Sequence, residues 1–334
     1  MCLVIELADG LVHLSSKQDE LGARDTIARL ESLVAEHPDL PDIVIDLAMG
    51  LVNLSSMQDE QGVRDTIARL ESLAAEHPDV PYIVIELATG LANLSDKQDE
   101  LGARDTIARL ESLVAEYPDL PDIAIELASG LVNLSSKQDE QGVRDTVAHL
   151  ESLADGYPDV PDIIIRLATG LYNLSVDQDE QSMRDIIARL ENLVAKHPDI
   201  PDVAIWLANG LVNLSVDQDK QGAQDTIARM ESLAAEHPDV PEIVIDLAKG
   251  LFCLSNKQDE QGARDTIARL ESLAAEHPDV PEIVIDLAKG LFNLSVDQDE
   301  QGARDTIARL EGLAVEHPDV PDIVIAFTEG LGLV

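Results

Sequence analysis

Aromatic residues are scarce in this chain: Phe, Trp and Tyr make up 2% of its 334 residues. Leu, Ile, Val and Ala must therefore build the core. The two cysteines, Cys2 and Cys253, are too few and too far apart in sequence for a disulfide framework or a metal motif. No apolar run is long enough to span a membrane. The N-terminal segment lacks the basic region and cleavage site of a secretory signal, so the sequence predicts a soluble, cytoplasmic protein.

Positive charge is also in short supply. Lys and Arg number 23 against 65 Asp and Glu, which leaves a formal net charge of −42. Such a surface repels nucleic acids and anionic membranes and favours basic partners. We therefore expect a protein or peptide partner of basic character, and neither nucleic acid nor membrane. Adaptation to high salt is typical of the same composition, and this alternative stays open.

What the chain has in abundance is repetition. The segment 281–320 recurs at every step of forty residues, so that Leu-Ser returns at 14–15, 54–55, 94–95 and onward to 294–295. The predicted repeats are 1–40, 41–80, 81–120, 121–160, 161–200, 201–240, 241–280 and 281–320, with a half repeat at 321–334. A fixed period of this length is typical of stacked supersecondary units. We expect one elongated repeat domain over 1–334.

Each repeat is predicted to hold two helices, A and B, with Pro281 and its equivalents as position 1. Apolar residues at positions 3, 4, 7, 11 and 14 form one face of helix A, and positions 23, 27, 30 and 34 form one face of helix B. Asp279, with Glu282, is expected to cap helix A. His317-Pro318 is expected to end helix B.

The turn between the two helices lies somewhere in positions 15–23. Either Gly302 is the C-cap of a long helix A, or Ser295 caps helix B directly. Asp305 and Arg309 are expected to pair within helix B, four residues apart. Glycine at position 10 of all nine copies, from Gly10 to Gly330, predicts the close approach of a neighbouring helix.

The Leu-Ala pair at positions 7–8 and the Pro-rich junction resemble tetratricopeptide (TPR) repeats. Leu247-Ala248, Leu251, Leu270 and Pro278 stand where that family places its packing residues. The unit differs in its forty residues and in lacking the signature aromatics. The LxNLS segment is similar to armadillo or HEAT-like repeats, the second choice. Either resemblance implies an all-α, right-handed superhelical solenoid of antiparallel helix pairs, whose concave helix-A surface binds an extended peptide.

The candidate binding surface is the stripe at positions 2, 6, 9 and 13 of helix A. Positions 2, 6 and 9 vary among the repeats, whereas position 13 holds a row of asparagines, whose amides are suited to pair with a peptide backbone. Trp and Arg on the stripe are typical of binding hot spots. The predicted peptide-binding residues are Asn53, Asn93, Asn133, Arg166, Tyr172, Asn173, Trp206, Asn209, Asn213, Lys249, Lys289 and Asn293.

Three alternatives accompany this hypothesis. The variable stripe is also what a drifting solvent-exposed face looks like, and the acids at position 6 (Glu6, Asp46, Glu86 and Glu126) fit a solvated acidic face. The asparagines are equally suited to bond their own helix end or a neighbouring turn. The apolar ends of the array also suit a structural spacer or a rod that associates end to end.

Catalytic and metal motifs are not supported. The segment from Asp297 to Asp305 resembles the opening of a calcium loop, but Ala308 stands where the bidentate Glu is required. The histidines at position 37 lie one repeat apart and suit helix C-termini. Every acidic motif is copied along the chain, whereas an active site is normally unique. We therefore predict no enzyme activity, no cofactor and no metal.

Overall fold

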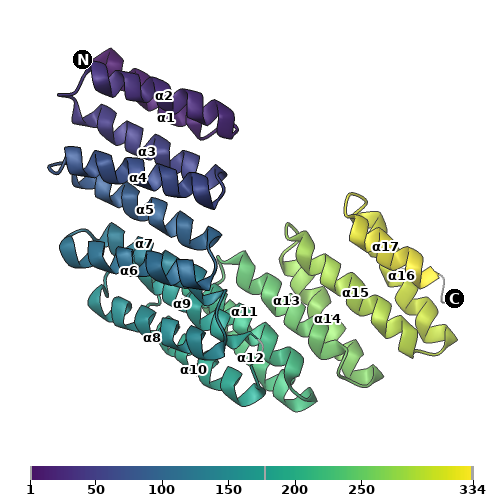
Figure 1. Ribbon diagram of the computed structural model, residues 1–334. Coiled ribbons are helices and arrows are strands. Elements are labelled where there is room, and N and C mark those ends of the chain that lie inside the picture. The colour runs from purple at the N-terminus through teal and green to yellow at the C-terminus, as the bar shows by residue number, and fades with distance from the viewer. Residues whose placement is uncertain (1, 177, 332–334) are drawn as a thin grey trace. The chain divides into compact units, whose positions relative to one another are not determined.

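The computed structural model describes residues 2–176 and 178–331, and it forms two compact units, Met1–Leu174 and Ser175–Val334 (Figure 1). Over the described residues the secondary structure is helical, with two helices per repeat. The helices are α1 (Cys2–Ser15), α2 (Glu20–Glu36), α3 (Pro41–Met57), α4 (Glu60–Glu76), α5 (Pro81–Lys97), α6 (Glu100–Glu116), α7 (Pro121–Ser135), α8 (Glu140–Gly156), α9 (Pro161–Ser175), α10 (Glu180–Lys196), α11 (Pro201–Asp217), α12 (Lys220–Glu236), α13 (Pro241–Ser255), α14 (Glu260–Glu276), α15 (Pro281–Asp297), α16 (Glu300–Glu316) and α17 (Pro321–Leu331).

The turn inside each repeat is set by an aspartate at position 19. Asp59 is the N-cap of α4, and its Oδ1 accepts the backbone N–H of Gly62 at 2.9 Å. The glycine at position 22 is therefore the third residue of helix B. Both predicted alternatives were wrong, because Ser295 lies inside α15 and Gly302 inside α16. Position 19 offers the side chain with the right reach, and a carboxylate there also faces the positive end of the helix.

The junction between repeats differs from its prediction at one end only. Helix B ends before the His-Pro pair as expected, since α16 stops at Glu316. Helix A begins at proline, but the N-cap of α15 is Val280, which makes no side-chain cap bond. Asp279 is thus not the cap. A tight turn replaces it, in which the N–H of Val280 donates to the carbonyl of His277 at 3.2 Å.

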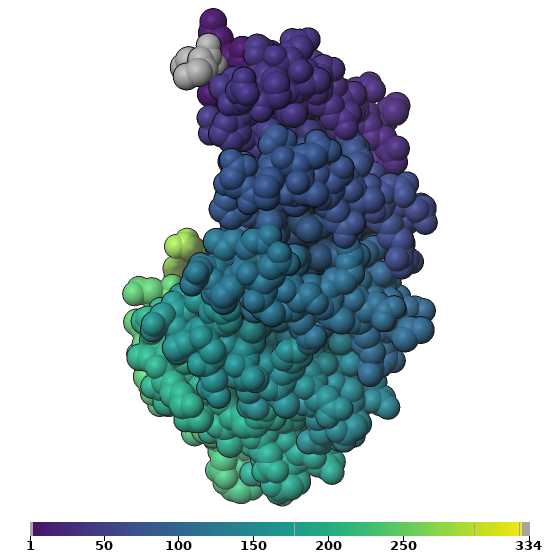
Figure 2. Space-filling model, turned by 60° about the vertical axis from the view of Figure 1, so that its left-hand side comes forward, coloured from purple at the N-terminus to yellow at the C-terminus, as the bar shows by residue number. Residues whose placement is uncertain are grey.

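The core lies between successive repeats. In the first unit α1 packs on α3, α3 on α5 and α5 on α7, and the A helices α3, α5 and α7 also pack on the B helix of the repeat before them. In the second unit α11, α13, α15 and α17 follow the same pattern. Ile43, Leu47, Leu51 and Leu54 show the predicted apolar face of helix A to be buried. The repeats of the first unit follow one another across the surface in chain order (Figure 2).

The glycines at position 10 explain how the helices approach so closely. A Cβ added at Gly250 would lie 2.6 Å from Cδ1 of Ile227, and one at Gly170 would lie 2.6 Å from Cδ1 of Leu150. Both neighbours belong to helix B of the preceding repeat. Gly10, in the first repeat, has nothing within 4 Å. The predicted close approach is confirmed at Gly170 and Gly250, where the preceding repeat causes it, and the surroundings of Gly330 lie outside what the structure describes.

These observations confirm an all-α, solenoid-like fold of repeated helix pairs. The right-handed sense of a superhelix and the organisation of 1–334 as a single domain stay predictions.

Candidate functional site

The stripe at positions 2, 6, 9 and 13 is less exposed than a freely solvated surface. Position 2 is exposed, as at Asp42 and Tyr82. Position 6 is partly covered, so that Asp46 and Glu126 are half-buried and Glu86 is only 9% exposed. The alternative of a solvated acidic face is therefore wrong for Glu86, because the neighbouring repeat covers the side chain of Glu86.

Crowding and burial perturb Asp46. Removal from water raises the pKa of its carboxyl to about 6, and the negative charges of Asp9 in the preceding repeat and Asp42 on its own helix add to the increase. The ionised form of Asp46 is thus disfavoured by its surroundings. A cation placed beside it would reverse this effect.

Glu86 is perturbed more strongly. Burial raises its pKa to about 7, the charge of Glu126 contributes in the same direction, and a hydrogen bond with Tyr82 opposes the increase. The pKa of Glu126 is raised as well, again mainly by burial, although the hydroxyl of Thr89 donates to its Oε1 at 3.2 Å and Arg166 favours its ionised form. Three neighbouring repeats thus hold carboxyls whose charge is incompletely compensated.

In the second unit, lysines of the same helix neutralise the acidic side chains at position 6. Lys249 Nζ donates to Oδ1 of Asp246 at 2.8 Å, and Lys289 Nζ donates to Oδ1 of Asp286 at 3.1 Å. Asp246 is 3% exposed, and burial still raises its pKa despite the lysine. The two lysines predicted to contact a peptide are therefore engaged with buried aspartates of their own helices.

The asparagine row bonds the repeats to one another. Nδ2 of Asn93 donates to Oγ of Ser55 at 2.9 Å, and Asn173 makes the same bond to Ser135 at 2.9 Å. Asn53 and Asn133 bond the equivalent serines at 3.2 Å. These bonds join each asparagine to helix A of the preceding repeat, and not to its own helix end or to a turn as the alternative expected. Each bond uses one of the three hydrogen-bonding positions of the amide, so contact with a peptide stays a prediction.

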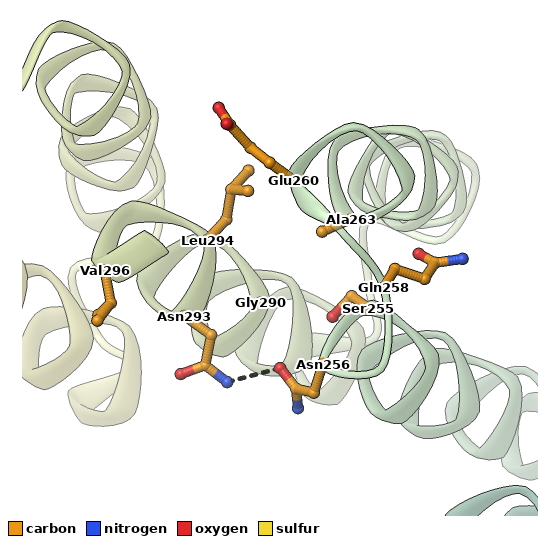
Figure 3. Close-up of a pocket in the computed structure, with 9 residues that line it drawn as sticks. All are labelled: Ser255, Asn256, Gln258, Glu260, Ala263, Gly290, Asn293, Leu294 and Val296. Carbon is orange, nitrogen blue, oxygen red and sulfur yellow. Dashed lines mark hydrogen bonds between the residues drawn. The ribbon is translucent and has the colours of Figure 1, made fainter. Parts of the chain in front are cut away.

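Asn293 departs from this pattern. Its Nδ2 donates to Oδ1 of Asn256 at 2.9 Å, and the two amides face each other in Figure 3. Beside them lies a cavity of about 260 Å³, lined among others by Ser255, Gln258 and Gly290. An added Cβ at Gly290 would come no closer than 3.6 Å to its neighbours. The two repeats are thus less tightly packed at this point than at Gly250.

The remaining predicted residues belong to α9 and α11. Asn209 Nδ2 donates to the carbonyl of Ile205 on its own helix at 2.9 Å. Arg166 has a buried Nε with no hydrogen-bond partner among the described residues. Tyr172, Trp206 and Asn213 are half-buried. A peptide-contact role for these residues stays a prediction.

Two sets of cross-links were missed from the sequence. Arg309 bonds Glu271 of the preceding repeat, whereas Asp305 accepts from Gln301, so the predicted Asp305–Arg309 pair is wrong. Equivalent Arg–Glu pairs tie successive B helices together, and between α6 and α8 a histidine takes the place of the arginine, with His149 Nε2 3.5 Å from Oε1 of Glu111. Within each turn, Thr66 Oγ1 donates to Oε1 of Gln58 at 2.8 Å. Arg recurs at position 29 and Glu at position 31 of the repeats, and this recurrence is the sequence pattern from which the Arg–Glu pairs could have been predicted.

Among the described residues, no three His, Cys, Asp or Glu side chains gather as a metal ion would need. Within that same part of the chain, no helix is both long and apolar enough to cross a membrane.

No protein-family model matches the chain, and neither does any curated protein. Similar solved structures include a circular tandem repeat protein of novel repeat topology, 15% identical, over 99% of this chain and 95% of that one, at a TM-score of 0.34. Another comes from a study of a phosphorylation switch in the cadherin and beta-catenin interaction, 15% identical, over 98% and 72%, at 0.39. A third is the TPR domain of P58(IPK), 12% identical, over 98% and 98%, at 0.25.

At such identities and scores, the chain's own helices are the evidence for its class. They alternate in antiparallel pairs that recur every forty residues, with A helices stacked on A helices. Two antiparallel helices in each forty-residue unit define the chain as an all-α helical repeat protein.

Proposed function

We propose that the protein is an interaction scaffold whose helix-A surface binds an extended, basic segment of a partner protein. The observation that carries this proposal is the row of Asp46, Glu86 and Glu126, whose carboxyl pKa values are all raised. A lysine or arginine side chain beside these groups would offset both their burial and their mutual repulsion. The net charge of −42 would attract such a segment from a distance.

The A helices suit this role because they lie close together. Successive A helices such as α3 and α5 pack against each other, whereas long Arg–Glu pairs such as Arg69–Glu31 connect successive B helices. Closer spacing on one side curves a stack toward that side, which supports a concave helix-A surface. The asparagine row runs along the same face, and its remaining amide positions can pair with a peptide backbone.

The test is binding of fluorescently labelled hexalysine, followed by anisotropy, to the full chain and to the triple variant Asp46→Asn, Glu86→Gln, Glu126→Gln. We expect affinity to fall by at least about tenfold in this variant, or 1.4 kcal/mol. Binding to the unmodified chain should also weaken as pH falls from 8 to 5, because Asp46 and Glu86 become protonated.

The matched control removes the same number of charges from the exposed ends of B helices in the same unit, as Glu36→Gln, Glu76→Gln, Glu116→Gln. It should bind hexalysine within about twofold of the original chain. Equal losses in the two triple variants would show general charge attraction and overturn the site.

A structural rod that associates with second copies of itself is the other candidate. It is favoured by exposed leucines on α1, among which Leu3 is 80% exposed. Leu7 and Leu14 lie exposed on the same helix. An apolar face of this kind is typical of an interface.

A further inference from the structure

The polar cavity beside Asn293 lies in the second unit, next to the turn between α13 and α14 (Figure 3). This turn forms one side of the cavity, and the last turns of α15 form the other. Its polar lining residues are Ser255, Asn256, Gln258, Glu260 and Asn293. Glu260 is already paired with Arg264, whose Nη2 lies 2.5 Å from Oε1 of the glutamate. The hydrogen bonds that the cavity can offer a ligand therefore come mainly from neutral groups.

In other turns a lysine of the chain itself occupies the equivalent place. Nζ of Lys257, at position 17 of the seventh repeat, donates to the carbonyls of Val216 and Gln218 in the preceding turn, at 2.6 and 2.7 Å. In the first unit, Nζ of Lys137 donates to the carbonyl of Asp96 at 2.6 Å in the same way. The fold thus uses an ammonium group to bind the carbonyls at positions 16 and 18 of a turn.

The eighth repeat cannot supply this ammonium group, because its residue at position 17 is Asp297. The carbonyls equivalent to those that Lys257 binds belong to Asn256 and Gln258. Neither carbonyl has a hydrogen-bond partner among the described residues, and both residues line the cavity. This turn therefore keeps the acceptors that bind a lysine elsewhere in the chain, without the lysine.

Two side-chain oxygens add to these carbonyls. In earlier repeats the serine at position 15 accepts a bond from the asparagine of the next repeat, as Ser55 does from Asn93. Asn293 donates to Asn256 instead, so Oγ of Ser255 keeps its acceptor position. Oδ1 of Asn293 also has no donor within the described part of the chain. A lysine ammonium has three N–H donors, which these oxygens can accept.

We propose that this cavity binds the ammonium group of a lysine side chain from a partner protein. Hydrogen bonds from a charged donor are stronger than those between neutral groups, and the net charge of −42 attracts a cation. The inference rests on the proposed function in assigning the lysine to a basic partner. It concerns a different site, because Asp46, Glu86 and Glu126 belong to the first unit.

The probe is Nα-acetyl-lysine methylamide, titrated into the isotope-labelled full chain and followed by nuclear magnetic resonance. We expect saturable shifts of the side-chain amide signals of Asn256 and Asn293. Asp297→Lys supplies an ammonium group from the chain itself, as Lys257 does one repeat earlier, and should weaken binding of the probe at least about tenfold. The analogue acetylated on its side-chain nitrogen has the same stem without the charge and should produce no such shifts.

The matched control is Asp297→Met, which removes the same aspartate and introduces the residue of the second repeat at this position, Met57. It should bind the probe within about threefold of the original chain. Equal affinity of the Asp297→Lys variant and this control, equal shifts with the acetylated analogue, or no saturable shifts at all would overturn the proposal. The triple variant at Asp46, Glu86 and Glu126 should give the same shifts as the original chain, so the two sites can fail independently.

Discussion

At the scale of single residues, burial between repeats changes the chemistry of a repeated acid. Glu6 and Glu86 occupy the same position of their repeats, but Glu6 is exposed and Glu86 is covered by its neighbours. The fold holds Glu86 at a cost in stability that depends on pH. A residue kept in such a setting is a good candidate for a binding role, because a partner cation would recover that cost.

Replacing Glu86 by glutamine should stabilise the protein at high pH. The folded-state pKa of about 7 lies above the ordinary value of 4.5, so ionisation destabilises the fold progressively between these values and fully above 7. We expect Glu86→Gln to gain up to about 3 kcal/mol at pH 8 and much less at pH 5. The midpoints of urea unfolding of the variant and the original chain at pH 5 and pH 8 measure this gain in stability.

The control for this prediction is Glu6→Gln, at the exposed equivalent position, which should show no such difference between the two pH values. An equal gain at pH 5 and pH 8 for Glu86→Gln would attribute the effect to packing and contradict the ionisation argument.

At the scale of elements, one glycine position sets how closely helix A meets the preceding helix B. An added Cβ would lie 2.6 Å from the nearest neighbouring atom at Gly250 but 3.6 Å from it at Gly290. The difference accompanies the changed asparagine bond at Asn293 and the polar cavity beside it. Packing between nearly identical repeats is therefore not uniform.

Alanine should have opposite effects at these two glycines. At Gly250 the methyl group would press on Ile227 and Met230, and overpacking of this kind costs roughly 1–3 kcal/mol. At Gly290 the contact is ordinary, and alanine should stabilise the helix by up to about 1 kcal/mol. Thermal unfolding followed by circular dichroism measures both. Stabilisation by Gly250→Ala would show that the neighbouring side chains move aside without strain.

At the scale of the whole molecule, a repeat array is stable only as far as each repeat covers the next. Helix α3 is covered in this way by α1 and α2, whereas Leu3 and Leu7 of α1 are exposed. The strong acidity of the chain opposes association of like copies. Attraction between apolar faces and charge repulsion therefore act in opposite directions.

If copies associate through α1, sedimentation should show a mass that rises with protein concentration and with added salt. Leu3→Lys with Leu7→Glu should abolish this rise while leaving the helical content unchanged, because both side chains are exposed. The control Leu21→Lys with Leu101→Glu changes exposed leucines on B helices instead. A constant monomer mass at all concentrations would exclude the self-associating rod.

The sequence by itself determined the forty-residue period, the two helices, their buried faces, the end of helix B at His-Pro and the tight contact at glycine. Each of these follows from apolar spacing or from the backbone preferences of proline and glycine, which act within a few residues. Prediction at this level needed no knowledge of how one repeat lies against the next.

The tertiary structure alone decided which side chains meet. Several residues compete to cap the turn, and only the geometry selects Asp59 and its equivalents. The partners of Asn93, Arg309 and Lys249, and the burial of Glu86, depend on distances across and between helices. Helical periodicity places a residue on a face, but the separation of neighbouring helices determines whether that face is open to solvent, to a partner or to the next repeat.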